Sequence, residues 1–137
     1  MKVDPRLEAA YARGRMIQAK LRAAEGGSIS ASRAAARLGI SQTMLLRWYR
    51  TGKVIGWKEG KIAIRFPVWQ FKGRKVLRGL AEVVATMDSG SKILDGYGHM
   101  LFLLSDLGAL QGGRPLDLLR KGDVQGAKEI AVAYFGR

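Results

Sequence analysis

Four small residues divide the segment from residue 30 to residue 52 into two short helices joined by a tight turn. Ser30 and Ser41 each stand where a hydroxyl can accept a hydrogen bond from the first turn of a helix. Gly39 and Gly52 stand where a helix can end in the left-handed conformation, which glycine adopts without strain. The spacing predicts one helix that ends before Gly39 and a second that begins after Ser41, which is the layout of a helix-turn-helix.

The second of these helices is expected to have one basic face and one apolar face. Successive residues turn by about 100° around a helix axis, which places Thr43, Arg47 and Arg50 on one side. The opposite side carries Leu45, Trp48 and Tyr49. In a helix-turn-helix, the first residues and the exposed face of the second helix enter the major groove, where they contact base edges and phosphates. The residues of this helix that are predicted to contact DNA are Ser41, Gln42, Thr43, Arg47 and Arg50. An ordinary helical hairpin with a charged outer face is the alternative.

After Gly52 the pattern changes from helical to extended. Residues 54–57 and 62–66 flank a turn-like stretch at 58–61, which predicts a β-hairpin. A hairpin directly after the second helix resembles the wing of a winged helix, and its cations would then lie near the DNA backbone. These cations are Lys53, Lys58, Lys61 and Arg65. Solubility is the alternative reason for lysines at a hairpin tip. The nearby rings of Trp69 and Phe71 are expected to pack in the core under the wing.

The charge of the chain is unevenly distributed. Residues 1–80 hold 18 Lys and Arg against 4 Asp and Glu, whereas residues 81–137 hold 6 against 7, so the first part carries all of the net +13. An imbalance of this size indicates a polyanionic partner for the first part and a different role for the second. Because the basic part also carries the helix-turn-helix pattern, the expected polyanion is duplex DNA.

Residues 5–24 are predicted to form a basic amphipathic helix. Asp4 and Pro5 suit the cap and the first position of a helix, and Gly26-Gly27 ends the pattern. Apolar residues recur at helical spacing, namely Leu7, Ala10, Tyr11, Ile17 and Leu21. Its charged face allows three interpretations, which are a solvated surface, an arm that follows DNA phosphates, and a contact between two copies of the chain.

The second part of the chain is expected to be helical. Residues 80–87 and 99–104 are strongly apolar, Pro115 can begin a short helix, and Asp123 can cap a last one. Together the patterns predict a mainly α fold with a helix-turn-helix, a small β-hairpin wing and a small helical C-terminal lobe. The expected regions are an amphipathic helix at 1–27, a winged helix-turn-helix DNA-binding region at 28–79 and the helical lobe at 80–137.

Several classes of function are not expected. The chain has no cysteine, which excludes disulfides and thiolate metal sites. No apolar run approaches the roughly 20 residues of a membrane span, and the start lacks the apolar segment of a signal peptide, so a cytoplasmic protein is expected. The one histidine, His99, lies in an apolar segment, where a hydrogen-bonded core histidine is the expected role. We therefore expect neither an enzyme nor a bound cofactor.

Two segments resemble a known family. Residues 112–119, Gly-Gly-Arg-Pro-Leu-Asp-Leu-Leu, followed by Gly122-Asp123 and a helix near the terminus, resemble the C-terminal toxin-binding domain of antitoxins of the Xre, MbcA and ParS group. Residues 37–41 and 66–71, with Trp48 and Gly52-Lys53, resemble the helix-turn-helix region of members of that group. The resemblance covers most of the chain from about residue 28.

The resemblance implies a partner and a set of contact residues. The partner would be a toxin of the RES-domain kind, which has an ADP-ribosyltransferase-like fold and consumes or transfers from NAD. The lobe at 80–137 would then be the toxin-binding domain, with its last helix and C-terminus near the active-site cleft of the toxin. The implied toxin-binding residues are Arg114, Asp117, Tyr134, Phe135 and Arg137. A plain connection between helices, with Arg114 and Asp117 as a local ion pair, is the alternative for the loop.

Two functions remain open from the sequence. The first is an antitoxin of a type II toxin-antitoxin system, which binds and neutralises a RES-domain toxin and represses its own operon through DNA binding. The second is a free-standing, dimeric winged-helix transcriptional regulator whose C-terminal lobe serves dimerisation or ligand sensing. In both cases we expect a homodimer, because helix-turn-helix proteins usually pair to match two half-sites.

Overall fold

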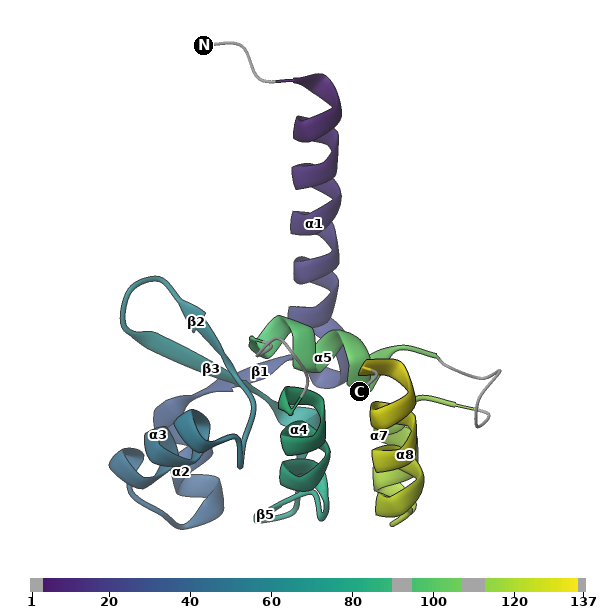
Figure 1. Cartoon of the computed structure of the whole chain (residues 1–137). Helices are drawn as coiled ribbons and strands as arrows, with labels where there is room; N and C mark the ends of the chain where they lie inside the picture. Colours follow the sequence, from purple (N-terminus) through teal and green to yellow (C-terminus); the bar gives the residue numbers. More distant parts are fainter. Residues whose placement is uncertain (1–3, 90–94, 107–112, 136–137) are drawn as a thin grey trace.

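The computed structural model describes residues 4–89, 95–106 and 113–135, and within them the fold is mainly α with a small antiparallel sheet (Figure 1). The first helix, α1, runs from Pro5 to Ala23 and stands away from the body of the protein. The side chain of Asp4 accepts a hydrogen bond of 2.9 Å from the backbone N–H of Arg6. This confirms the predicted helix at the N-terminus, and the short 3-10 helix η1, Ala24–Gly26, follows it.

The two predicted helices after residue 30 are present with their caps. Helix α2 spans Ala31–Leu38 and α3 spans Gln42–Thr51. Ser30 Oγ accepts from the N–H of Arg33 at 3.2 Å, and Ser41 Oγ accepts from the N–H of Met44 at 3.0 Å. Gly39 and Gly52 end the two helices with φ of 69° and 82°, in the left-handed region that favours glycine.

The predicted β-hairpin is present, with a shorter first strand and an unpredicted neighbour. Strands β2, Trp57–Glu59, and β3, Ala63–Pro67, pair antiparallel, and β1, Ser28–Ser30, pairs with the other edge of β3. The prediction that the first strand begins at Val54 is wrong. The reason is the side-chain amide of Gln70. It accepts from the backbone N–H of Ile55 and donates to its C=O, both at 2.8 Å, so these backbone groups do not pair with a neighbouring strand.

A second small hairpin and a set of helices complete the fold. After the 3-10 helix η2, Val68–Gln70, strands β4, Phe71–Lys72, and β5, Lys75–Val76, pair antiparallel. The helices that follow are α4 at Leu80–Asp88, α5 at Gly96–Leu104, α7 at Pro115–Arg120 and α8 at Val124–Phe135. Helix α8 packs against α4 and α7. Asp95 and Asp123 cap α5 and α8, as each carboxylate accepts from a backbone N–H three residues later at 2.8 and 2.9 Å.

The apolar core crosses the boundary at which the charge changes. Trp57 and Trp69 from the basic part are each 4% exposed and belong to the same core cluster as Leu80, Met100 and Leu116. A smaller cluster lies under α2 and α3 and comprises Ala34, Ala35, Leu45, Val54, Phe66 and Phe71. The buried Trp69 and Phe71 confirm that these rings pack in the core. Residue 80 therefore marks a change in surface charge rather than a gap in packing.

No helix among residues 4–89, 95–106 and 113–135 combines the length and the apolar character needed to cross a membrane.

Candidate nucleic-acid interface

The outer face of α3 is polar, basic and open to solvent. Gln42 and Thr43 are exposed in its first turn, and Arg47 and Arg50 are exposed further along. Leu45 is fully buried on the other side, where Trp48 and Tyr49 are half-buried. The N–H groups at the start of α3 also point outward, and Ser41 satisfies only that of Met44. We call Gln42, Thr43, Arg47 and Arg50 the α3 outer face, and Met44, 37% exposed, lies beside it.

The sequence around the α3 outer face carries no negative charge. Between Glu25 and Glu59 the chain has no Asp or Glu but has six cations, which are Arg33, Arg37, Arg47, Arg50, Lys53 and Lys58. Carboxylates next to a phosphate-binding surface would repel the phosphates. The stretch that contains α2 and α3 therefore carries no such carboxylate of its own, and Asp88 and Asp95 approach α3 at the pocket beside its end.

The predicted cations of the hairpin have different surroundings. Lys58 and Lys61 are exposed at the β2–β3 hairpin, and Lys53 Nζ lies 5.9 Å from the centroid of the Trp48 ring. Arg65 is half-buried instead, and its guanidinium donates to Ser28 Oγ at 3.1 Å and to the Ser28 carbonyl at 2.9 Å. These bonds hold β1 against β3, so Arg65 has a structural role in the sheet.

Two exposed side chains of the basic part, Ile62 and Arg74, were not among the predicted contact residues. Ile62 is 91% exposed in the turn of the β2–β3 hairpin, where a free apolar side chain has no role in packing. Arg74 lies in the β4–β5 turn, and one of its nitrogens is 3.9 Å from the position that a Cβ on Gly39 would occupy. Arg37 fixes this turn, because its Nε donates to the Gly73 carbonyl at 2.6 Å. The basic run from Lys72 to Lys75 was the available signal for Arg74.

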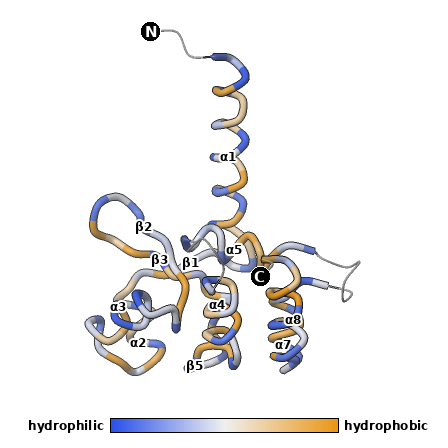
Figure 2. Tube along the Cα trace, viewed as in Figure 1, coloured by the Kyte–Doolittle hydropathy of each residue, from blue (hydrophilic) through white to orange (hydrophobic). Residues whose placement is uncertain are grey.

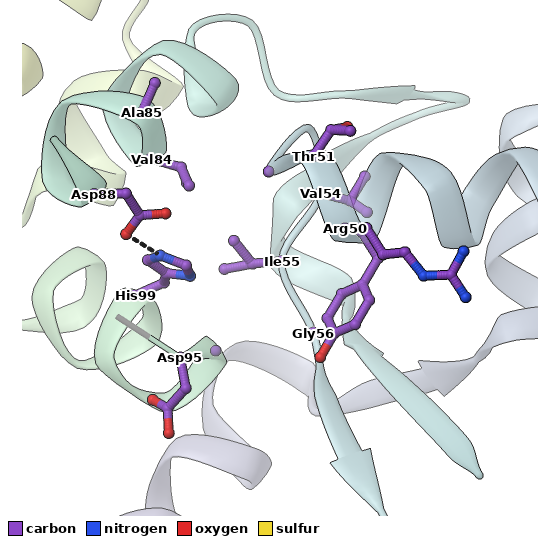
Figure 3. Close-up of a pocket in the computed structure, with 13 residues that line it drawn as sticks. Arg50, Thr51, Val54, Ile55, Gly56, Val84, Ala85, Asp88, Asp95 and His99 are labelled. Atoms are coloured by element: carbon purple, nitrogen blue, oxygen red, sulfur yellow. Dashed lines mark hydrogen bonds and ion pairs between the residues drawn. The ribbon is translucent and has the colours of Figure 1, made fainter. Parts of the chain in front are cut away.

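A pocket of about 430 Å³ lies between the end of α3, the segment 54–56, α4 and α5 (Figure 3). His99, which is 8% exposed, lies in it with Nε2 at 2.9 Å from Asp88 Oδ1. The expectation of a hydrogen-bonded core histidine is confirmed, and its partner is Asp88 of α4. Burial and, to a lesser degree, the negative charge of Asp95 raise the pKa of Tyr49. Figure 3 shows Arg50 extending away from His99, toward the outer side of α3.

The implied toxin-binding residues Arg114 and Asp117 are bound to each other and to the body of the protein. Arg114 donates to both carboxylate oxygens of Asp117 at 3.0 and 2.9 Å and to Glu25 at 3.1 Å. Arg120 also donates to Glu25 at 2.9 Å. These guanidinium groups lower the pKa values of Asp117 and Glu25. The contacts match the alternative of a local ion pair and extend it into a network that ties α7 to η1.

The other implied toxin-binding residues lie at the end of α8. Tyr134 is 55% exposed, and its ring centroid lies 5.4 Å from that of Phe102 and 5.1 Å from that of Phe135. We call these three rings the C-terminal aromatic cluster. Arg137, and Gly112 at the start of the family-like segment, lie outside the described residues.

Comparisons with known proteins bear on the fold alone. No protein-family model matches the sequence, and no curated protein matches it significantly. Among solved structures, the chain is similar to the NMR structure of Rv2175c, with a TM-score of 0.68 and 16% sequence identity over 82% of this chain and 83% of that chain. The mainly α architecture with its small sheet is thus shared with an experimental structure.

Proposed function

We propose that this protein binds duplex DNA as a winged helix-turn-helix transcriptional regulator, with α3 in the major groove and the β2–β3 hairpin as the wing. One observation carries the proposal, which is the exposed polar and basic face of α3 on a stretch of chain without any carboxylate. Helix α2 would cross the DNA backbone, as the first helix of such a motif does.

The residue types on the α3 outer face suit base recognition. Arg47 has the forked donors that pair with two acceptors of guanine, and Gln42 can pair with adenine. Lys58 and Lys61 are exposed on the hairpin, and phosphate contacts from them would add affinity without sequence preference. Ile62 is 91% exposed in the turn of the same hairpin, and an apolar side chain at that position can contact a sugar or enter a groove.

The substitution Arg47→Ala tests the role of α3. On the preferred sequence, selected from a random DNA library with the intact protein, the variant should lose about 1–3 kcal/mol of binding free energy, and less on random DNA. Lys121→Ala is the matched control, because it removes one exposed cation from the end of α7. Fluorescence anisotropy with labelled duplexes gives both affinities. Equal losses for the two variants would contradict a recognition role for α3.

A second function, that of an antitoxin, is supported by the C-terminal aromatic cluster. We propose that Tyr134 and Phe135 contact a RES-domain toxin in a heteromeric complex in the cytoplasm, and that the protein neutralises this toxin by binding rather than by catalysis. An exposed tyrosine that rests on two further rings is typical of the residues that dominate interface energies. Arg114 and Asp117 would act indirectly, by holding α7 in place.

Coexpression with a RES-domain toxin tests this second function. Tyr134→Ala should abolish growth rescue and co-purification of the toxin. Glu129→Ala, which truncates an exposed side chain of α8 more than about 100° around the helix from both Tyr134 and Phe135, should leave both unchanged. If both variants rescue growth, the aromatic cluster does not bind the toxin.

A further inference from the structure

Helix α1 leaves the body of the protein, and most of its length is uncovered. Of its 19 residues only Leu21, close to its end, is buried. Figure 1 shows most of the helix standing clear of the other described elements, with only its end beside α5, and Figure 2 shows apolar residues recurring along it. A single helix of this length is only marginally stable in water, because most helices in proteins are stabilised by packing an apolar face. A helix that stands this far from the body is therefore expected to have a partner.

Three of the four large exposed apolar residues of α1 share one face. Leu7, Tyr11 and Ile17 are 47%, 58% and 48% exposed. At 100° per residue they share an arc of about 120° with Ala10 and Gly14, and we call this face the α1 stripe. A Cβ on Gly14 would meet nothing within 4 Å. No contact within the chain therefore requires glycine, a poor helix former, in the middle of α1. Small residues at the centre of a stripe do allow a second helix to approach closely.

We propose that the α1 stripe binds the α1 stripe of a second copy of this chain in the antiparallel orientation. When the uncovered parts of both helices, residues 5–20, lie side by side, Tyr11 stands opposite Gly14 of the second copy, and Leu7 lies within one residue of the level of Ile17. The Tyr11 ring then occupies the space above the glycine. Two-fold symmetry repeats each of these contacts, which gives a self-complementary interface.

Charge favours the antiparallel orientation over the parallel one. Asp4 and Glu8 outnumber Arg6 at the start of α1, and Lys20 and Arg22 lie at its end. In an antiparallel pair the acidic start of each helix lies beside the basic end of the other, whereas a parallel pair would bring the two basic ends together. Glu8 and Arg15 also share a flank of the helix, so Glu8 of one copy comes within about one turn of Arg15 of the other. The opposed helix dipoles add to this preference.

The pairing goes beyond the proposed DNA binding, because it sets the distance between two copies. In this register the two-fold axis passes between residues 12 and 13, about 16 Å along the helix from Ala23. The two bodies are then attached about 32 Å apart, and half-sites one helical turn apart on DNA are separated by about 34 Å. An operator with two inverted half-sites is the expected match.

Molar mass in solution tests the pairing. Light scattering during size-exclusion chromatography should give twice 15.0 kDa for the intact protein at micromolar concentrations, and 15.0 kDa for Leu7→Lys and Ile17→Lys. Met16→Lys is the matched control, because Met16 is 59% exposed but lies on the opposite side of α1, and this variant should remain a dimer. A monomeric intact protein, or a dimer that survives both stripe variants, would overturn the proposal.

Cross-linking locates the contact. Because the chain has no cysteine, Gly14→Cys and Met16→Cys each introduce a single thiol. A short bismaleimide should join two copies of Gly14→Cys and leave Met16→Cys unlinked, and equal yields would contradict the assignment of the stripe. If the intact protein is monomeric and deletion of residues 1–20 weakens DNA binding, α1 is an arm on DNA and the pairing is refuted. Neither the mass nor the cross-link depends on DNA, so the proposed function is tested separately.

Discussion

Replacement of Gln70 by leucine tests the residue that joins the α2–α3 region to the hairpin. Gln70 is fully buried, and its amide makes three hydrogen bonds, two to the backbone of Ile55 at 2.8 Å and one to the Pro67 carbonyl at 3.1 Å. Leucine has a similar volume but can make none of them. The N–H and C=O of Ile55, a residue that is 2% exposed, would lose these partners.

The expected loss of stability can be estimated from those two backbone groups. A buried donor or acceptor left without a partner costs about 1–3 kcal/mol, and the added apolar burial of leucine offsets part of the sum. We expect Gln70→Leu to lower the free energy of unfolding by about 2–4 kcal/mol. Urea unfolding followed by tryptophan fluorescence measures it, because Trp57 and Trp69 are buried in the main core.

A matched control separates this effect from the general effect of leucine. Gln125 is exposed on α8, so Gln125→Leu should change the free energy of unfolding by less than about 0.5 kcal/mol. A loss below about 1 kcal/mol for Gln70→Leu, or equal losses for the two variants, would refute the role of the Gln70 amide in holding residue 55.

Two further predictions concern contacts between distant parts of the chain. In the folded state Arg120 and Arg114 lower the pKa of Glu25, and Arg114 lowers the pKa of Asp117. The unfolded state therefore binds protons first, and the stability from this network is lost as the pH falls through those lowered values. Thermal melts from pH 7 to pH 3 should therefore show a smaller acid-induced loss for Arg114→Ala than for the intact protein, and equal losses would contradict this. Gly96→Ala should destabilise the fold by about 1–3 kcal/mol in urea unfolding, because a Cβ there would overlap the carbonyl oxygen of Gly56. An unchanged stability would show that α5 can shift away from the hairpin.

The parts of the fold that the sequence predicted are those that depend on neighbouring residues. A serine cap or a left-handed glycine acts within one helical turn, so Ser30, Gly39 and Ser41 were sufficient to place α2 and α3. The same holds for α1 and for the start of α8. The two faces of α3 followed from helical periodicity alone. In the structure the predicted basic side is exposed, and the predicted apolar side is buried or half-buried.

The parts that the sequence did not predict depend on contacts between distant residues. Strand β1 forms only because Ser28–Ser30 meets β3 more than thirty residues later. The Arg114–Glu25 ion pair joins residues 89 apart, and no local pattern marks either of them as a partner. The expected regions at 28–79 and 80–137 followed the charge, which is a property of the surface, whereas the core is apolar and continues across residue 80. For the same reason, the sequence did not distinguish Arg65, bonded to Ser28, from the exposed lysines of the hairpin.

The dependence of DNA affinity on salt concentration tests the proposed DNA binding by α3 and the hairpin. The exposed cations on and beside α3 and on the hairpin are Arg47, Arg50, Lys53, Lys58, Lys61 and Arg74. If four to six of them replace counterions on the phosphates, a plot of log K against log salt concentration should be linear with a slope of about −4 to −5 per bound copy. Anisotropy titrations of the intact protein with a random-sequence duplex from low to moderate salt give this slope. We expect a steep negative slope. An intact protein that does not bind the duplex, or that binds it with an affinity independent of salt, would contradict the proposed DNA binding.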